Sequence, residues 1–470
     1  MNTTDMIALS PMIVVAATIV CLMLIIAFHR DYRLTAGATA IGLIAAMVAL
    51  LPAWKLVPRP VTSLLLIDQY ALLFTGLLLL TGLVVTLLAT GYWARQGGQR
   101  EEFYLLLLLA TLGTIVLASA VHFASFFLGL EILSVSLYTL IAYPRQATST
   151  QAGLKYLILA AVSASILLFG MALVYADRGT MALDQLAAAP DGGLLWLAGL
   201  SLILVGIGFK LAIVPFHMWI ADVYAGAPVP TAMFVATASK AAVFAVLLRF
   251  FLVLSQPEAQ ASYGIITAIA IFSMLGGSFL VLVQRNVKRL LGYSSIAHIG
   301  YALVALLVGG TAAAISVTFY LAAYTLTLLA AFGVIILLGD PTRDADALSD
   351  YQGVFWRKPG LAVVLTVALF SLAGIPLTAG FFGKFLLLMA GVGAAEWLLA
   401  VVLVVSSGIS LFAYLRWVVV MFRATATPEV VRINRQAMGG AVLATLLLLL
   451  LWIGIYPKPL LSFLQTSLGG

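Results

Sequence analysis

The sequence is poor in charged residues and in cysteine. Only 9% of its 470 residues are charged and 64% are hydrophobic, a composition that excludes a soluble protein. Its single cysteine, Cys21, excludes a disulfide framework and a cysteine cluster for zinc or iron–sulfur ligation. No Walker or dinucleotide-binding glycine motif follows a predicted strand. These absences leave a helical membrane protein, and we attribute its net charge of +7 to loops rather than to nucleic-acid binding.

Hydropathy divides the chain into apolar segments, most of them long enough to cross a bilayer as a helix. The segments lie at 8–28, 34–51, 67–94, 103–121, 123–143, 153–176, 194–223, 230–255, 262–284, 290–309, 311–338, 359–390, 396–422 and 437–457. We therefore predict an all-α membrane protein with about 14 transmembrane helices. Its expected parts are a three-helix N-terminal segment (1–102), two repeated units (103–255 and 262–422) and a C-terminal helix (437–470).

Lysine and arginine residues in the loops set the expected orientation. With the N-terminus outside, 15 of the 24 basic residues lie in cytoplasmic loops and 4 in outer loops. The cytoplasmic set is Arg30, Arg33, Arg95, Arg100, Arg145, Lys155, Arg285, Lys288, Arg289, Arg343, Arg357, Lys358, Arg423, Arg432 and Arg435. The outer set is Lys55, Arg59, Arg178 and Lys458. Both termini are therefore expected on the outer, periplasmic side.

The second unit repeats features of the first. Segment 209–215 (FKLAIVP) matches segment 370–376 (FSLAGIP) at Phe, Leu, Ala and Pro, and Lys240 stands at nearly the same spacing from Ser407. Because each unit has five helices, the second copy runs in the opposite direction. We predict two inverted repeats, helices 4–8 and 9–13, whose helices 7 and 12 are broken because proline lacks the N–H of a helical residue.

Four ionisable residues fall near the middle of predicted helices: Glu131, Lys210, Lys240 and Lys384. Glu131, for example, lies ~12 Å along its helix. Each such charge costs roughly 2.5–3.5 kcal/mol on insertion scales, so the four are expected to be paired or hydrated. One interpretation is a static ion pair between Glu131 and a lysine. The other is that desolvation and neighbouring charges make the lysines able to bind and release protons.

Two histidines give a weaker signal. His217 follows Lys210 by seven positions, which would place both on one face of a helix, and His298 lies in the segment SSIAHIGY. Imidazole is suited to relay protons near neutral pH. It also serves as a plain hydrogen-bonding group between membrane helices, and the sequence leaves both interpretations open.

Other charged residues are interpreted as structural. Arg249 and Arg416 lie near opposite membrane surfaces, so we expect them to act as anchors that reach the interface. Asp68 and Asp222 fall at helix ends and are expected to be caps or interface groups. The connection 339–358, rich in Asp, Pro and Gly, is typical of a surface loop.

Three stretches resemble a known family. VPFHMWIADVYAGAPVPTAMFVATASK, LGYSSIAHIGY and GIPLTAGFFGKF are similar to subunit N of proton-translocating NADH-quinone oxidoreductase (respiratory complex I), one of the antiporter-like subunits of that complex. The resemblance covers nearly the whole chain, and the DVYAGAP turn favours this family over the other antiporter-like subunits. It implies a bacterial inner-membrane protein surrounded by lipids and by the other membrane subunits, including neighbouring antiporter-like ones, with no nucleic-acid partner.

The resemblance also implies roles for the buried residues. Glu131 and Lys210 would form a coupled acid–lysine pair, Lys240 would be the central lysine, and Lys384 would face the outer exit. The supporting members of this polar axis would be Lys155, His217 and His298. The family keeps FMN, iron–sulfur clusters and quinone in partner subunits, so no cofactor is expected in this chain.

Two other functions stay open at this point. A sodium/proton antiporter subunit would share the fold and the buried charges. A passive membrane scaffold would keep the fold, but its buried charges could be neutralised without loss of transport.

Overall fold

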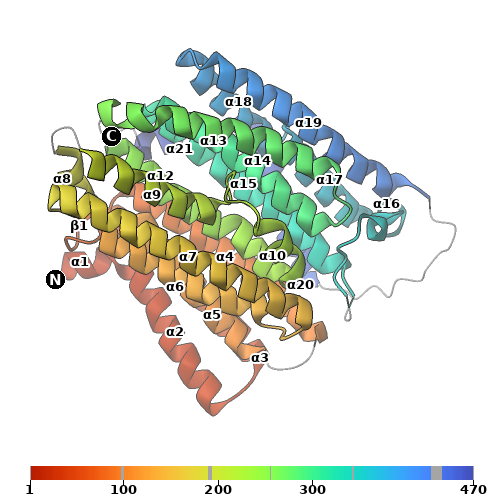
Figure 1. The fold of residues 1–470 in the computed structure, drawn as a ribbon. Helices are drawn as coiled ribbons and strands as arrows, with labels where there is room; N and C mark the ends of the chain where they lie inside the picture. Colours follow the sequence, from red (N-terminus) through yellow and green to blue (C-terminus); the bar gives the residue numbers. More distant parts are fainter. Residues whose placement is uncertain are drawn as a thin grey trace.

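A computed structural model describes residues 2–96, 100–188, 193–253, 256–340, 343–424 and 437–468, which form one bundle of long helices (Figure 1). Among these residues, 13 helices are long and apolar enough to span a membrane. The remaining predicted span, 359–390, is divided between two shorter apolar helices, α17 and α18. The prediction of an all-α membrane protein with about 14 spans is confirmed. Arg432 and Arg435 of the predicted cytoplasmic set lie outside the described residues.

The long helices follow the predicted segments. They are α2 (Ser10–Phe28), α3 (Tyr32–Trp54), α4 (Gln69–Gln96), α5 (Glu101–Ser119), α6 (Phe123–Ala142), α7 (Ala147–Arg178), α9 (Leu194–Leu211), α12 (Lys240–Val253), α13 (Gln256–Leu282), α14 (Val287–Val308), α15 (Gly310–Leu338), α17 (Pro359–Ala373), α18 (Ala379–Gly393), α19 (Trp397–Phe422) and α20 (Ala437–Ile455). A π-helix, η1 (Val235–Ser239), joins the short α11 (Val229–Phe234) to α12.

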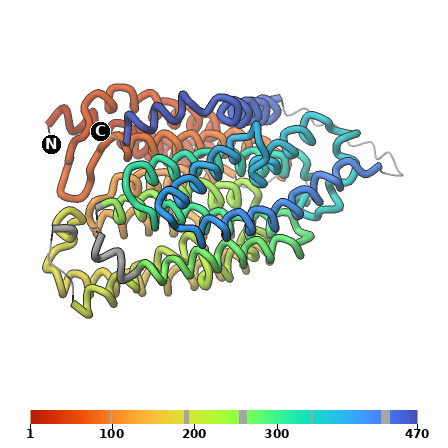
Figure 2. The backbone as a smooth tube through the Cα atoms, turned by 90° about the horizontal axis from the view of Figure 1, so that it is seen from above, coloured from red at the N-terminus to blue at the C-terminus, as the bar shows by residue number. Residues whose placement is uncertain are grey.

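Short elements lie between and beside the spans. They are α1 (Thr3–Ala8), the hairpin strands β1 (Arg59–Pro60) and β2 (Leu66–Ile67), α8 (Leu183–Ala188), α10 (Ile220–Gly226), the 3₁₀-helix η2 (Leu348–Tyr351), α16 (Val354–Arg357) and α21 (Lys458–Leu468). Both chain termini lie at the same end of the bundle, as an even number of spans requires (Figures 1 and 2). Helices α20 and α21 return along α4, so the C-terminal segment packs against the N-terminal one (Figure 2).

Two helices are broken where the sequence predicted. Helix α9 ends at Leu211 because Ala212 adopts a left-handed conformation (φ 57°), and α17 ends at Ala373 before Gly374 (φ 80°). Proline follows each end, which prevents the helix from resuming at once. The path α9–α10 runs opposite to the path α17–α18 (Figure 1), in agreement with inverted repeats.

Helices α5 and α6 pack closely against each other. A Cβ atom on Gly113 would lie 2.7 Å from the backbone nitrogen of Leu133, and one on Gly129 would lie 3.0 Å from that of Leu117. Only glycine lets the two backbones approach so closely. This contact fixes α6, which carries Glu131.

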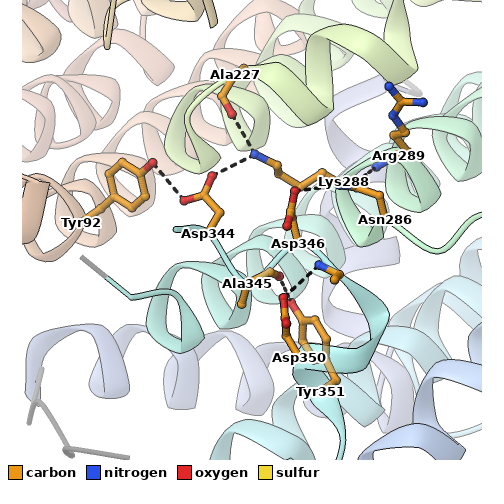
Figure 3. A network of polar contacts seen from close by, with 11 residues as sticks. Tyr92, Ala227, Asn286, Lys288, Arg289, Asp344, Ala345, Asp346, Asp350 and Tyr351 are labelled. Atoms are coloured by element: carbon orange, nitrogen blue, oxygen red, sulfur yellow. Dashed lines mark hydrogen bonds and ion pairs between the residues drawn. The ribbon is translucent and has the colours of Figure 1, made fainter. Parts of the chain in front are cut away.

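The connection 339–358 is not only a surface loop, and that prediction was wrong for its central part (Figure 3). The carboxylate of Asp344 accepts from Lys288 Nζ at 2.9 Å and from the Tyr92 hydroxyl at 3.1 Å. Lys288 also donates to the carbonyl of Ala227 at 3.1 Å. The segment therefore ties α4 and the connection between α10 and α11, in the first half, to α14 in the second half.

Further contacts of the same connection hold it in place (Figure 3). Asn286 donates its amide to Asp346 at 2.8 Å, and Tyr351 donates its hydroxyl to the carbonyl of Ala345 at 2.8 Å. Burial, reinforced by the carboxylate of Asp350, raises the pKa of Tyr351 well above its ordinary value, so its hydroxyl stays protonated and keeps donating. The segment is thus a fixed part of the bundle end.

The sequence suggested that Arg249 is an anchor that reaches the membrane surface, and this prediction was wrong. Its side chain is buried, and both Nη atoms donate to the carboxylate of Asp68 at 2.8 Å. The guanidinium also lies 4.7 Å from the ring centroid of Tyr70. Asp68 caps α4 as predicted, through the backbone N–H of Ala71 at 2.7 Å. The two residues form a bidentate ion pair between α4 and α12.

Candidate functional site

Lys210 lies in the last turn of α9, directly before the first break, and only 4% of it is exposed. Its ammonium donates to the hydroxyl of Ser134 on α6 at 2.6 Å. It also lies 5.3 Å from the ring centroid of Tyr156, within cation–π range. A polar hydroxyl and an aromatic face therefore surround the ammonium.

Glu131 stands one turn before Ser134 on α6 and is half-buried. It makes no ion pair within 4.0 Å among the residues that the structure describes. Its charge still attracts Lys210 at longer range. The interpretation of Glu131 and a lysine as a static contact pair is therefore contradicted.

Lys240 occupies the centre of the bundle. It is the first residue of α12, directly after the π-helix η1, and 1% of it is exposed. Its ammonium donates to the Ser295 hydroxyl on α14 at 2.7 Å. A π-helical turn within a helix is frequent at functional sites, because the extra residue redirects the side chains that follow it.

His298 lies on the same face of α14 as Ser295, one turn further along. Its Nδ1 is hydrogen-bonded to the Tyr320 hydroxyl at 2.6 Å and its Nε2 lies 3.4 Å from the Tyr414 hydroxyl. The imidazole stacks on Tyr324, with ring centroids 5.0 Å apart. Both ring nitrogens thus face tyrosine hydroxyls, and the ring interacts electrostatically with both Lys240 and Lys384.

Lys384 lies on α18, just beyond the second break, and 7% of it is exposed. Its ammonium donates to the carbonyl oxygens of Leu372 at 2.7 Å and Ala373 at 3.1 Å, which α17 leaves free at its C-terminus. A third bond goes to the Ser407 hydroxyl on α19 at 2.7 Å. The side chain therefore closes the broken end of α17 with a positive charge.

His217 does not share a helix face with Lys210, and this prediction was wrong. The helix ends at Leu211, and residues between Ala212 and the start of α10 form turns rather than a continuous helix. His217 is half-buried, and its Nδ1 has no hydrogen-bond partner among the described residues. The structure places it apart from the lysine contacts.

Lys155 also lies away from the buried lysines. It pairs with Asp222, which Arg289 contacts at 3.1 Å from the other side. These residues border an open cleft of about 660 Å³ at one end of the bundle. The cleft is lined by Thr148, Gln151, Ala152, Lys155, Asp222, Ala225, Gly226, Gln284, Asn286, Arg289 and Asp346.

The arrangement gathers four of the seven predicted residues in the bundle interior: Lys210, Lys240, His298 and Lys384. Amines, an imidazole and hydroxyls can all bind and release or pass protons. Among the described residues no group of three or more His, Cys, Asp or Glu could hold a metal ion. The sequence did not single out the serine and tyrosine residues that contact the lysines and His298 through a hydroxyl or a ring face. They are Ser134, Tyr156, Ser295, Tyr301, Tyr320, Tyr324, Ser407 and Tyr414. Serine and tyrosine are common in membrane helices, so only the repeat match at Ser407 marked one of them.

Comparison with known proteins gives consistent results. Residues 120–410 match the family described as NADH:quinone oxidoreductase/Mrp antiporter, TM. NADH-quinone oxidoreductase subunit N of Methylococcus capsulatus is 46% identical over 98% of this chain and 95% of its own length.

Solved structures agree. A chain of respiratory complex I from Thermus thermophilus with bound aureothin has a TM-score of 0.84 and 34% identity, covering 96% of this chain and 98% of that chain. A chain of the Mrp complex from Dietzia sp. has a TM-score of 0.87 at 22% identity, covering 100% and 97%, a likeness of fold alone. The resemblance seen in the sequence is confirmed: the chain belongs to the family of NADH-quinone oxidoreductase subunit N, a family of antiporter-like, multi-pass membrane proteins.

Proposed function

We propose that this chain translocates protons as a membrane subunit of an NADH:quinone oxidoreductase. Protons move among Glu131, Lys210, Lys240, His298 and Lys384, driven by quinone reduction in other subunits. Lys155, with Asp222, supplies protons from the cleft, and His217 is a secondary relay at the first break. This proposal rests on the family and on the chemistry of the buried residues.

One observation carries the proposal. Lys210, Lys240 and Lys384 are almost fully buried, yet none has a carboxylate within 4.0 Å among the described residues. A lysine kept only for structure would be paired, because an unpaired buried charge costs roughly 2.5–3.5 kcal/mol even on the mildest scales. Three such residues held by neutral oxygen atoms are suited to changing their protonation state.

The partners follow from the proposed function. FMN, iron–sulfur clusters and quinone belong to other subunits, and neighbouring antiporter-like subunits flank this chain in the membrane. The bacterial relative favours a bacterial inner membrane. The excess of lysine and arginine in one set of loops favours an orientation with both termini on the periplasmic side.

The test is proton pumping by the complete complex carrying Lys210→Met, reconstituted in vesicles and driven by NADH. We expect at least a tenfold loss of pumping per NADH oxidised with normal assembly, as the buried carrier is removed without leaving an unpaired charge. Lys55→Met, on an exposed lysine outside the predicted spans, is the control and should pump normally. Normal pumping by the Lys210 variant would leave the chain a passive scaffold.

The Mrp-like fold favours a second candidate, a cation/proton antiporter subunit that exchanges sodium. The same vesicles separate the two functions. Pumping that continues at full rate in sodium-free medium supports the proton-only function, and pumping that requires sodium supports the antiporter.

A further inference from the structure

We infer that Ser134, Ser295 and Ser407 are positioning residues whose hydroxyls reverse their hydrogen bonds when the buried lysines gain or lose a proton. The inference rests on the proposed function, because it concerns how the lysines change their protonation state. It adds to the charged axis three neutral residues that no charge pattern marks.

One contact recurs at all three lysines. In each case the ammonium donates to a serine on a different helix, and the contacts are Lys210 Nζ to Ser134 Oγ at 2.6 Å, Lys240 Nζ to Ser295 Oγ at 2.7 Å and Lys384 Nζ to Ser407 Oγ at 2.7 Å. Ser134 and Ser295 are almost completely buried. The hydroxyls are therefore fixed polar groups in apolar surroundings.

Each serine also donates its own proton to a backbone carbonyl. The acceptors are Leu130 O for Ser134 at 2.5 Å, Gly292 O for Ser295 at 2.6 Å and Ala373 O for Ser407 at 3.2 Å. With its proton directed at a carbonyl, a hydroxyl offers its lone pairs to the ammonium. This arrangement fits the charged lysine.

The same hydroxyl fits the neutral lysine after one rotation. It turns away from the carbonyl and donates to the free lone pair of the amine. The carbonyls of Leu130 and Gly292 lie inside helices and accept a backbone N–H as well, so each loses only its second bond. The serine oxygen, the lysine nitrogen and the backbone carbonyl therefore each keep at least one hydrogen bond in both states, which keeps the cost of the change low.

A carboxylate could not do this. When ionised it only accepts hydrogen bonds, and its charge would hold the proton on the lysine. A buried ion pair would therefore fix one protonation state, whereas a serine permits both.

The serines follow the internal repeat. Ser134 and Ser295 stand at the same spacing as Phe209 and Phe370, and Ser407 takes the position that Lys240 has in the first repeat. Other buried serines, such as Ser136, donate to a carbonyl without touching a lysine. The lysine contact is thus a property of selected positions.

Other titratable groups face the same lysines. Around Lys210 they are Glu131 and Tyr156, around Lys240 they are Tyr224, His298 and Tyr324, and around Lys384 they are His298 and Tyr301. Of these groups, Tyr224 and Tyr324 also interact with the Ser295 hydroxyl, so the change in pH dependence is judged against Ser295→Thr, which keeps that hydroxyl.

The experiment compares Ser295→Ala with Ser295→Thr in the complete complex, measuring the pH profile of NADH-driven proton pumping in vesicles. Alanine removes the acceptor of the ammonium, so we expect the alkaline limb of the profile to move to lower pH by about one unit. At pH values on that limb pumping falls about tenfold. Threonine keeps the hydroxyl and should restore the wild-type profile.

Controls distinguish this inference from a loss of folding and from failure of the proposed function. Ser136→Ala should leave the profile unchanged, since its hydroxyl touches no lysine. Ser295→Cys, of nearly the same size as serine, gives an intermediate shift and replaces threonine if that variant does not assemble. A wild-type profile for Ser295→Ala while Lys240→Met abolishes pumping overturns this inference alone. Normal pumping by Lys240→Met overturns the proposed function with it.

Discussion

The bundle buries positively charged side chains in two different ways. At its ends, Arg249 and Lys288, which are 7% and 2% exposed, contact the carboxylates of Asp68 and Asp344. In its interior, Lys240 is buried to the same degree but contacts a neutral serine hydroxyl. Equal burial with different partners indicates different roles: a carboxylate keeps its cation charged, whereas a hydroxyl leaves the cation free to lose its proton.

Arg249 and Arg416 stand at the same spacing in the sequence as Lys240 and Ser407, and these two arginines also differ in their partners. Arg249 meets a carboxylate, whereas its counterpart Arg416 donates to the carbonyls of Leu282 and Gln284 at 2.7 Å each. Arg416 therefore caps the end of α13, and α12 is tied to α4 by a full ion pair. The two repeats share their helix breaks but differ in how their ends are fastened.

The largest effect on stability is expected at the bundle end shown in Figure 3. Asp344→Ala leaves Lys288 buried beside the Ala227 carbonyl without its counter-charge, and we expect a loss of about 3–5 kcal/mol. Blue-native electrophoresis and thermal inactivation of the complex would measure it. The double variant Asp344→Leu with Lys288→Met should recover most of the loss, and a single variant as stable as the wild type would contradict a structural role.

A smaller loss is expected at the second ion pair. Asp68→Asn keeps the size of the side chain and one hydrogen-bond acceptor for Arg249 but removes the counter-charge, so we expect a loss of about 2 kcal/mol. The same thermal inactivation assay applies. Pumping per NADH oxidised should stay normal in the complex that assembles, and a change in pumping ratio would place Arg249 in the proton path.

The smallest effect is expected at Lys210, when its distant carboxylate neighbour Glu131 is substituted. Its carboxylate attracts Lys210 only at a distance, so Glu131→Gln should reduce pumping by a few fold and leave assembly unchanged. Initial rates of vesicle acidification, normalised to NADH oxidation, would measure this. A complete loss of pumping would show that every translocated proton passes through Glu131, and no loss would remove Glu131 from the path.

The sequence indicated the functional residues that are rare in membrane helices, whereas it did not single out those that are common there. Charges and prolines inside apolar segments located Lys210, Lys240, Lys384 and both helix breaks. Ser134 and Ser295 could not be singled out, because serine is tolerated at many positions of such helices.

The roles predicted for some charged residues near the loops were wrong for a related reason. Arg249 was interpreted as an interfacial anchor because its partner, Asp68, is 181 positions away in the chain. Only the packing of α4 against α12 brings them together. Likewise, the Asp-rich connection near Asp344 has the composition of a loop, and its contact with Lys288 depends on the end of α14. The prediction that His217 shares a helix face with Lys210 was wrong because the helical periodicity does not continue across the break after Leu211.

The central claim is that the interior lysines change their protonation state, and Lys240→Arg tests it most directly. Arginine keeps the positive charge and can still donate to Ser295, but it stays protonated at every accessible pH. The measurement is proton pumping per NADH oxidised by the reconstituted complex, at matched assembly. A loss of tenfold or more is predicted. Near-normal pumping would contradict the account and make Lys240 a fixed charge like Arg249 and Lys288.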